Sequence, residues 1–248
     1  MFSSDDRIRK EEEKLKESQK VFGYVFDNST LLNIYRFFHN GYLDRFEFPI
    51  ASGKESIVFA ASKGDRFFAV KIYKVTASNF KNIREYASSR WGIGKISSKR
   101  KLMNEWAFRE FENLKNAKEA GVTVPKPIKV YGNVIQMQYI GTKSRPALQI
   151  KDIEPSDKIV EQIINDIRNL FLKGKLVHGD ISEYNFLYHR GKAYMIDIAQ
   201  AITTDDPYSL ILLKRDVTNI IRFLNKFGYS LNTDLVMKYV KGEADAFR

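Results

Sequence analysis

Three oxygen-bearing side chains lie within a short stretch near the end of this 248-residue chain. Asp180 and Asn185 belong to the run HGDISEYN, and Asp197 closes the run YMID a little further on. Carboxylate and amide oxygens are the ligands that hard divalent cations such as Mg²⁺ prefer, usually together with the phosphates of a substrate. The stretch therefore predicts a metal site that handles phosphate groups.

The segment between these residues predicts how they meet. Residues 186–196 read as a strand, a turn at a glycine and a second strand. A hairpin of this kind brings Asp180 and Asn185, on one loop, close to Asp197 at the end of the second strand. The layout resembles the catalytic loop of kinases followed by their metal-binding aspartate, so the sequence predicts a phosphoryl-transfer enzyme.

Each of the three side chains then has its own role. Asp180 is the candidate catalytic base, or the group that orients the attacking oxygen. Asn185 would hold Mg²⁺, and Asp197 would bridge the metal to the β- and γ-phosphates. A single aspartate after a glycine is usually a turn residue, so the interpretation depends on the ordered trio. His178 is expected to support this loop by hydrogen bonding.

A cation within an apolar strand adds a second part of the site. Lys71 lies in the run FAVKI and matches the strand lysine that neutralises the α- and β-phosphates and pairs with a helix glutamate. The alternative is an ordinary exposed strand position. Two acids of the predicted helix compete for this pairing. Glu110 is expected because it lies beside the apolar face, whereas Glu105 lies about 140° away from Glu110 round the helix.

The turn upstream of Lys71 is a candidate phosphate-covering loop. Residues 51–56 read ASGKES, where small side chains let backbone N–H groups approach phosphate oxygens. Glu55 follows Lys54, so the run is neither a P-loop nor a G-x-G-x-x-G motif. Taken alone it is an ordinary hairpin turn, and only its place before Lys71 favours the functional interpretation.

The elements that must position these residues change in kind along the chain. Residues 31–38 predict a helix capped by Asn28–Thr30, and an antiparallel meander follows at 46–52, 56–62 and 66–75. A long helix is expected at 99–120, a strand pair at 128–131 and 133–140, and helices at 157–173, 208–227 and 233–241. This shift from sheet to helix predicts an α+β chain with an N-terminal extension (1–45), a sheet-rich lobe (46–141) and a helix-rich lobe (142–248).

Composition restricts the partners. The net charge of +11 and the pI near 9.5 favour polyanions such as nucleic acid. Between Lys74 and Lys101 there are eight basic residues and one acid, either a solvated loop or a nucleic-acid contact, and residues 76–98 are expected to form a mobile or partly disordered loop. Residues 5–20 predict an exposed helix or a frayed terminus.

The chain has no cysteine, no apolar run that would span a bilayer and no secretory signal, so we expect a soluble cytoplasmic protein without a membrane partner.

Several runs together resemble one family. HGDISEYN at 178–185, IDIAQ at 196–200 and SGKES at 52–56 resemble the RIO family of atypical serine/threonine protein kinases. TLLNIY from Thr30 and LKRDVTNII from Leu213 add to the likeness, which covers most of the chain. The runs are more similar to the first, Rio-one type, subfamily than to the second, which carries an N-terminal winged helix.

The resemblance implies a trimmed bilobal protein-kinase-like fold with ATP and Mg²⁺ or Mn²⁺ in the cleft. It also implies autophosphorylation on serine, ATPase activity with a transient phosphate on Asp197, and a role in maturation of the small ribosomal subunit, with the subunit precursor or its rRNA as partner. Met137 would be the gatekeeper before the adenine-binding backbone. The residues implied at the nucleotide are Ser52, Lys54, Ser56, Lys71, Glu110, Met137, Gln138, Ile140 and Ser182.

The chain also departs from ordinary protein kinases. Ser182 stands where they carry a lysine, and no A-P-E run follows Asp197, so the segments that grip a peptide substrate are missing. Two functions therefore stay open: an ATP-dependent serine kinase or ATPase, and an ATP-gated pre-ribosome or rRNA-binding assembly factor with little activity on other proteins. A small-molecule kinase shares H-G-D-x-x-x-x-N, but the GKES turn and the IDIAQ run disfavour it.

Overall fold

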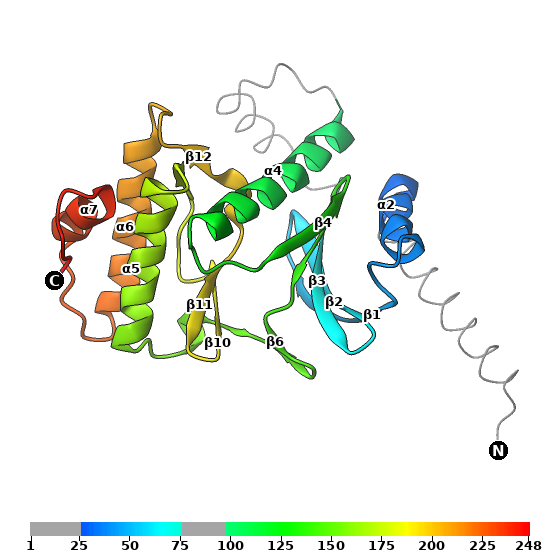
Figure 1. Ribbon diagram of the computed structural model, residues 1–248, viewed down its shortest axis with the longest axis horizontal. Coiled ribbons are helices and arrows are strands. Elements are labelled where there is room, and N and C mark those ends of the chain that lie inside the picture. Colours follow the sequence, from blue (N-terminus) through cyan, green and yellow to red (C-terminus); the bar gives the residue numbers. More distant parts are fainter. Residues whose placement is uncertain (1–25, 76–97) are drawn as a thin grey trace, which may run out of the picture.

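The computed structural model describes residues 26–75 and 98–248 (Figure 1). The segment at 5–20, expected as an exposed helix or a frayed terminus, and nearly all of the expected loop at 76–98 lie outside these residues. Within them the chain forms an antiparallel sheet with two helices beside it, followed by smaller sheets and three helices. No helix of the described part is long and apolar enough to cross a membrane.

The first sheet has five strands in the order β1-β2-β3-β5-β4. The predicted meander of three strands is confirmed, with β3 shorter than predicted. The predicted strand pair that follows the long helix extends the same sheet. Its strands are β1 (Arg45–Ser52), β2 (Ser56–Lys63), β3 (Arg66–Tyr73), β4 (Pro127–Tyr131) and β5 (Val134–Gln138). Lys71 pairs with Val58 on one side and Ile135 on the other, so it lies on the central strand.

Helix α2 (Asn28–His39) lies beside this sheet (Figure 1). Its N-cap is Asp27, whose Oδ1 accepts hydrogen bonds from Ser29 N and Thr30 N, both at 3.0 Å. The predicted cap at residues 28–30 was therefore wrong, since those residues form the first helical turn. A short carboxylate one residue earlier satisfies the exposed N–H groups of that turn.

Gly132, between β4 and β5, has a φ of +52° in the left-handed region. A Cβ there would lie 2.2 Å from Asn33 Nδ2 on α2. We expect Gly132→Ala to lower the free energy of unfolding by about 1 to 3 kcal/mol more than Gly64→Ala, because overpacking adds to backbone strain. Gly64 is the matched control, since its φ is +54° but nothing lies within 4 Å of the added Cβ. Equal losses in urea unfolding would contradict the close approach of α2.

Helix α4 (Lys99–Glu119) crosses beside the sheet, as predicted for residues 99–120 (Figure 1). The helix is polar on average, yet one side of it is buried. The apolar residues of that side are Leu102, Trp106, Leu114 and Ala117. Glu110 is also buried on this side, although glutamate is almost never buried without a partner. The helix therefore directs one carboxylate toward the sheet.

The second half of the chain places short strands among helices α5 (Asp157–Leu172), α6 (Ser209–Asn225) and α7 (Thr233–Lys241). The helices agree with the predicted ones to within two residues at either end. A three-stranded sheet has the order β11-β10-β8, and β9 (Leu176–Val177) pairs with β12 (Ile202–Thr203). The strands of the three-stranded sheet are β8 (Leu148–Gln149), β10 (Phe186–His189) and β11 (Lys192–Met195).

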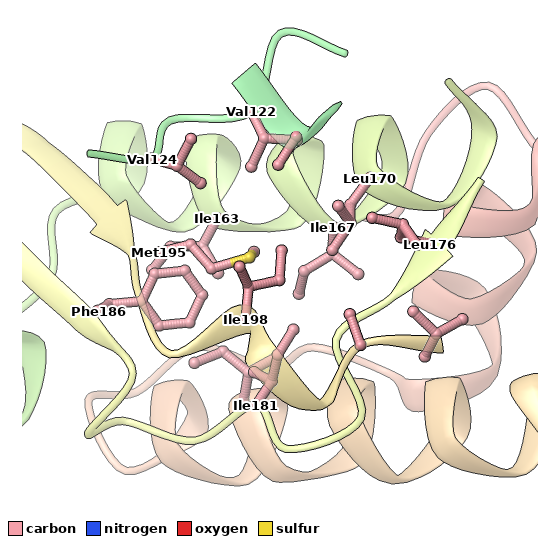
Figure 2. Close-up of a cluster of buried hydrophobic side chains, with 14 of the residues drawn as sticks. Val122, Val124, Ile163, Ile167, Leu170, Leu176, Ile181, Phe186, Met195 and Ile198 are labelled. Atoms are coloured by element: carbon pink, nitrogen blue, oxygen red, sulfur yellow. The ribbon is translucent and has the colours of Figure 1, made fainter. Parts of the chain in front are cut away.

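An apolar core lies between α5 and the two loops that carry the predicted chemistry (Figure 2). Ile163 and Ile167 of α5 meet Met195 of β11 there. Ile181, next to Asp180 in sequence, and Ile198, next to Asp197, both enter this core, and each is at most 1% exposed. Burying the neighbour of each aspartate anchors the loop that presents it.

Candidate active site

The predicted hairpin is present, and it brings the trio together. β10 and β11 pair antiparallel, with Phe186 opposite Met195. The pairing continues past the strands, since Ile196 N donates to Asn185 O at 2.9 Å. Asn185 just before β10 and Asp197 just after β11 therefore lie at the same end of the hairpin, as the sequence predicted.

Asp180, Asn185 and Asp197 line one cavity of about 350 Å³. Lys71 also lines it, together with Lys54 of the turn between β1 and β2 and Ser56 at the start of β2. No three His, Cys, Asp or Glu side chains of residues 26–75 and 98–248 group together as a metal site. Two carboxylates and one amide instead fit Mg²⁺, which takes few protein ligands and completes its shell with phosphates and water.

Asp197 is presented by an uncommon backbone conformation. Its φ of 61° and ψ of 43° are left-handed, and it begins the 3₁₀ turn Ile198–Gln200. A non-glycine residue there costs about 1 to 3 kcal/mol and persists only where its surroundings hold it. Asn113 of α4 helps, since its Nδ2 donates to Ile198 O at 2.9 Å. The Asp197 side chain is 52% exposed, and it borders the cavity.

Lys71 bridges two carboxylates. Its Nζ donates to Glu110 Oε1 at 2.7 Å and also to Asp197 Oδ1. The side chains of Lys71 and Glu110 are 8% and 2% exposed, so this pair is buried. Glu110 is thus the partner, as predicted, whereas Glu105 does not pair with Lys71 in the structure.

The electrostatics of this bridge favour the charged forms of Lys71 and Asp197. Burial opposes the ammonium form of Lys71, but the attraction of Asp197 and then Glu110 outweighs it and raises the pKa of Lys71 well above its usual value. The Lys71 charge in turn lowers the pKa of Asp197. A permanently charged lysine beside an ionised aspartate suits a site that receives both phosphates and a metal.

A second cavity of about 480 Å³ adjoins the first, since Gly53, Ser56, Lys71 and Asp197 line both. Its apolar walls come from the first sheet on one side and from the catalytic hairpin on the other: Ile50, Val58, Ala69, Leu187 and Ile196. A slot between two apolar faces fits a flat ring system. The predicted nucleotide residues Ser52, Met137, Gln138 and Ile140 also line it.

The backbone at the edge of the second cavity is already partly hydrogen-bonded. Gln138 N donates to Lys126 O at 2.8 Å, and Ile140 O accepts from Ala147 N at 3.0 Å. These bonds fix the segment next to the cavity. The Gln138 carbonyl and the Ile140 N–H of this segment are the candidates for polar contacts with a ligand.

Ser182 is the one predicted nucleotide residue that lines neither cavity. Its hydroxyl donates to Asn185 Oδ1 at 2.6 Å, so it orients the predicted metal ligand instead. His178 supports the loops as expected, since its Nε2 lies 3.0 Å from Ile196 O. That bond links the loop of Asp180 to the strand end before Asp197.

Sequence reasoning gave no role to Asp216, on α6, although it noted the run that contains it. Asp216 is fully buried and accepts hydrogen bonds from Gly179 N at 2.7 Å and Ile181 N at 2.9 Å. Burial raises its pKa, while the nearby His178 and the two backbone bonds oppose the rise. These bonds hold the backbone of the residue before Asp180 and of the residue after it. The sequence signal that could have identified Asp216 is its place on the apolar face of an amphipathic helix.

The match with known proteins agrees with this geometry. The family model described as the RIO domain matches residues 57–238. A RIO-type serine/threonine-protein kinase Rio1 from Thermoplasma acidophilum is 40% identical over 186 residues, which cover 75% of this chain and 99% of that protein.

Solved structures share the fold. The Rio2 kinase from Chaetomium thermophilum superposes with a TM-score of 0.70 at 22% identity, over 89% of this chain and 70% of that one. The Rio2 kinase-ADP/Mg²⁺-phosphoaspartate complex from the same organism has a TM-score of 0.65 at 22% identity, over 88% and 67% of the two chains. The α+β, kinase-like fold is thereby confirmed. With the family match over most of its length, the chain belongs to the RIO-type serine/threonine-protein kinases, in the Rio1 group.

Proposed function

We propose that the chain binds ATP across the two adjoining cavities and transfers its γ-phosphate with Asp180, Asn185, Asp197 and Lys71. The observation that carries this proposal is that all four side chains line one cavity, which opens into an apolar slot. Adenine would lie in the slot beside Met137, with the Gln138 carbonyl and the Ile140 N–H as its polar contacts. The triphosphate would then extend past the turn at 52–56.

The protein's part in the reaction is positioning and charge neutralisation, as in phosphoryl transfer generally. Lys71 would neutralise the α- and β-phosphates while Glu110 holds its ammonium in place. Asn185 and Asp197 would hold Mg²⁺, or Mn²⁺ in its stead, which neutralises charge on the phosphate oxygens. Asp180 would accept the proton of the attacking hydroxyl or water. Ser52, Lys54 and Ser56 would cover the phosphates from above.

Asp197 is the proposed acceptor when the enzyme works as an ATPase. Its carboxylate oxygen would form a bond to the γ-phosphorus as the bond to the β-phosphate oxygen breaks, and ADP would leave. Water would then hydrolyse the aspartyl phosphate. The Chaetomium Rio2 complex is described as containing a phosphoaspartate, which supports such an intermediate in this kinase fold. Serine autophosphorylation uses the same site with a hydroxyl as acceptor.

The wider setting is also part of the proposal. A net charge of +11 supports a polyanionic partner, which we take to be the rRNA of a small ribosomal subunit precursor in the cytoplasm. The division into residues 1–45, 46–141 and 142–248 stays a prediction. The second candidate function, an ATP-gated rRNA-binding factor with little turnover, is supported by the same charge and by the missing A-P-E run.

Asp180→Asn is the test of the enzymatic proposal. We expect release and transfer of the γ-phosphate to fall by about 10²- to 10⁴-fold, because the positioned base is lost. The measurement is phosphate release and self-labelling from γ-labelled ATP with Mg²⁺. Glu183→Gln, which also removes a carboxylate from the same loop, is the matched control and should keep activity.

Two results separate the candidate functions. Equal turnover by the Asp180→Asn and unaltered proteins would remove Asp180 from the mechanism. Negligible turnover by the unaltered protein, together with tight, salt-sensitive rRNA binding that depends on ATP, would favour the assembly factor.

A further inference from the structure

Tyr73 closes the central strand β3 next to the buried ion pair. Its hydroxyl donates a hydrogen bond to Glu110 Oε2, while Lys71 Nζ donates to Glu110 Oε1 at 2.7 Å. Tyr73 is 3% exposed and Glu110 is 1% exposed. Both carboxylate oxygens are therefore used by side chains two residues apart on one strand, which face the same side of the sheet.

We infer that Tyr73 is a positioning residue for phosphoryl transfer, which fixes the Glu110 carboxylate so that Glu110 can hold Lys71 at the nucleotide. The inference rests on the proposed role of Lys71. Tyr73 itself is assigned no contact with the reacting atoms, although its side chain borders the cavity of Asp180 and Asp197.

The ring of Tyr73 contributes a second contact. Lys71 Nζ lies 5.0 Å from the ring centroid, within the range of a cation–π interaction. Burial, with a further effect of the Glu110 charge, raises the pKa of Tyr73 well above its usual value. The hydroxyl therefore stays protonated and remains a donor to the carboxylate. Tyr73 thus touches both members of the pair, one with its ring and one with its hydroxyl.

The backbone of Tyr73 is held by one residue. Its N–H donates to Asn133 O at 2.9 Å, and its carbonyl accepts from Asn133 Nδ2 at 2.7 Å. The buried Asn133 side chain also binds Thr30 Oγ1 at 2.9 Å and Asn33 Nδ2 at 3.1 Å, both on α2. These contacts connect α2 to the ion pair through Tyr73.

The need for such a residue follows from competition at Lys71. Its ammonium donates to both Glu110 and Asp197, and Asp197 is the more exposed of the two acids. If Asp197 held a metal, Glu110 would be the carboxylate left to keep Lys71 in position. A carboxylate bound at both oxygens has fewer rotamers available than one bound at a single oxygen, so the hydroxyl restrains Glu110 at that stage.

The test is Tyr73→Phe, which keeps the ring and removes the hydroxyl. We expect kcat/KM for ATP to fall about tenfold to a hundredfold, the range of one hydrogen bond to a charged group. Tyr131→Phe is the matched control. Tyr131 is on β4 of the same sheet, and its hydroxyl accepts from Asn40 at the end of α2, outside the cavities. It should retain kcat/KM within about twofold.

A double-mutant cycle distinguishes positioning from packing. In a Glu110→Ala background, Tyr73→Phe should cost less than about twofold, because the hydroxyl no longer has a carboxylate to hold. An additive loss in that background would overturn the inference. Should Glu110→Ala fail to fold, judged by urea unfolding, the cycle is repeated with Glu110→Gln, where partial non-additivity is expected and full additivity overturns the inference. Retained activity in Lys71→Met would instead reject the proposed role of Lys71.

Discussion

Replacing Lys71 with methionine should lower the free energy of unfolding by about 3 to 5 kcal/mol and abolish phosphoryl transfer. Glu110 would be left as a buried charge without its cation, which is the costly way to break a buried ion pair. Asp197 is half-exposed, so it tolerates the loss of the lysine charge better than Glu110 does. Urea unfolding and phosphate release from ATP measure the two effects.

The double variant Lys71→Met/Glu110→Gln separates these effects. Without the uncompensated charge it should recover at least half of the lost stability, and the glutamine oxygen can still accept from Tyr73. Activity should remain absent, because the lysine proposed to neutralise the α- and β-phosphates is gone. A double variant that is less stable than Lys71→Met would contradict the cost assigned to burying the Glu110 charge without its cation. Restored activity would contradict the role of Lys71.

The pH dependence of the stability loss in Lys71→Met follows from the directions of the pKa shifts of Lys71 and Asp197. The raised pKa of Lys71 means that its contribution is complete below the ordinary lysine value of 10.5 and is lost only as pH rises through the raised pKa. The lowered pKa of Asp197 means that its contribution is present above 3.8 and is lost as pH falls through the lowered pKa. The stability difference between the unaltered protein and Lys71→Met should therefore be flat across the neutral range.

Asp216→Ala is expected to remove both stability and activity. The N–H groups of Gly179 and Ile181 would lose their acceptor inside the protein, at about 1 to 3 kcal/mol for each unsatisfied group. The loop would no longer hold Asp180 in place, and misplacement by about 1 Å costs about a hundredfold in rate. Turnover at saturating ATP, measured on the folded fraction, should fall at least that far.

Asn225→Ala is the control on the same helix. Asn225 also binds two backbone groups, donating to Leu231 O at 3.1 Å and accepting from Leu231 N at 3.0 Å. Its loss should destabilise the fold while kcat stays within about twofold, since Leu231 is not part of the site. If both variants lost activity in proportion to stability, Asp216 would have only a structural role.

The parts of the site that were predictable depend on short stretches of chain. The hairpin of residues 186–195 joins neighbours in sequence, so a turn glycine between two apolar runs was enough to bring Asn185 and Asp197 together. Glu110 was separable from Glu105 because the two lie on different faces of a regular helix, and periodicity identifies the buried face. The pairing of Glu110 with Lys71 was predicted from the kinase-like pattern, and the structure confirms it.

Two contacts that the sequence did not predict join distant positions. Asp216 lies 37 residues from Gly179, and Tyr73 lies 37 residues from Glu110. The assignment of Ser182 to the nucleotide stays a prediction, and the structure adds a bond from its hydroxyl to Asn185. The cap of α2 was placed one residue too late, because Asp27 and residues 28–30 are all good capping types, and a cap is decided by which side chain reaches the N–H groups of the first turn.

The sequence by itself determined the chemistry of this protein, because oxygen ligands, a strand lysine and a helix glutamate are recognisable by type and spacing. It also determined the regular elements, whose periodic apolar residues require burial on one face. Only the tertiary structure decided which buried polar groups satisfy one another, such as Asp216 with the catalytic loop and Tyr73 with Glu110. A buried donor must find an acceptor somewhere in the fold, and sequence spacing does not say where.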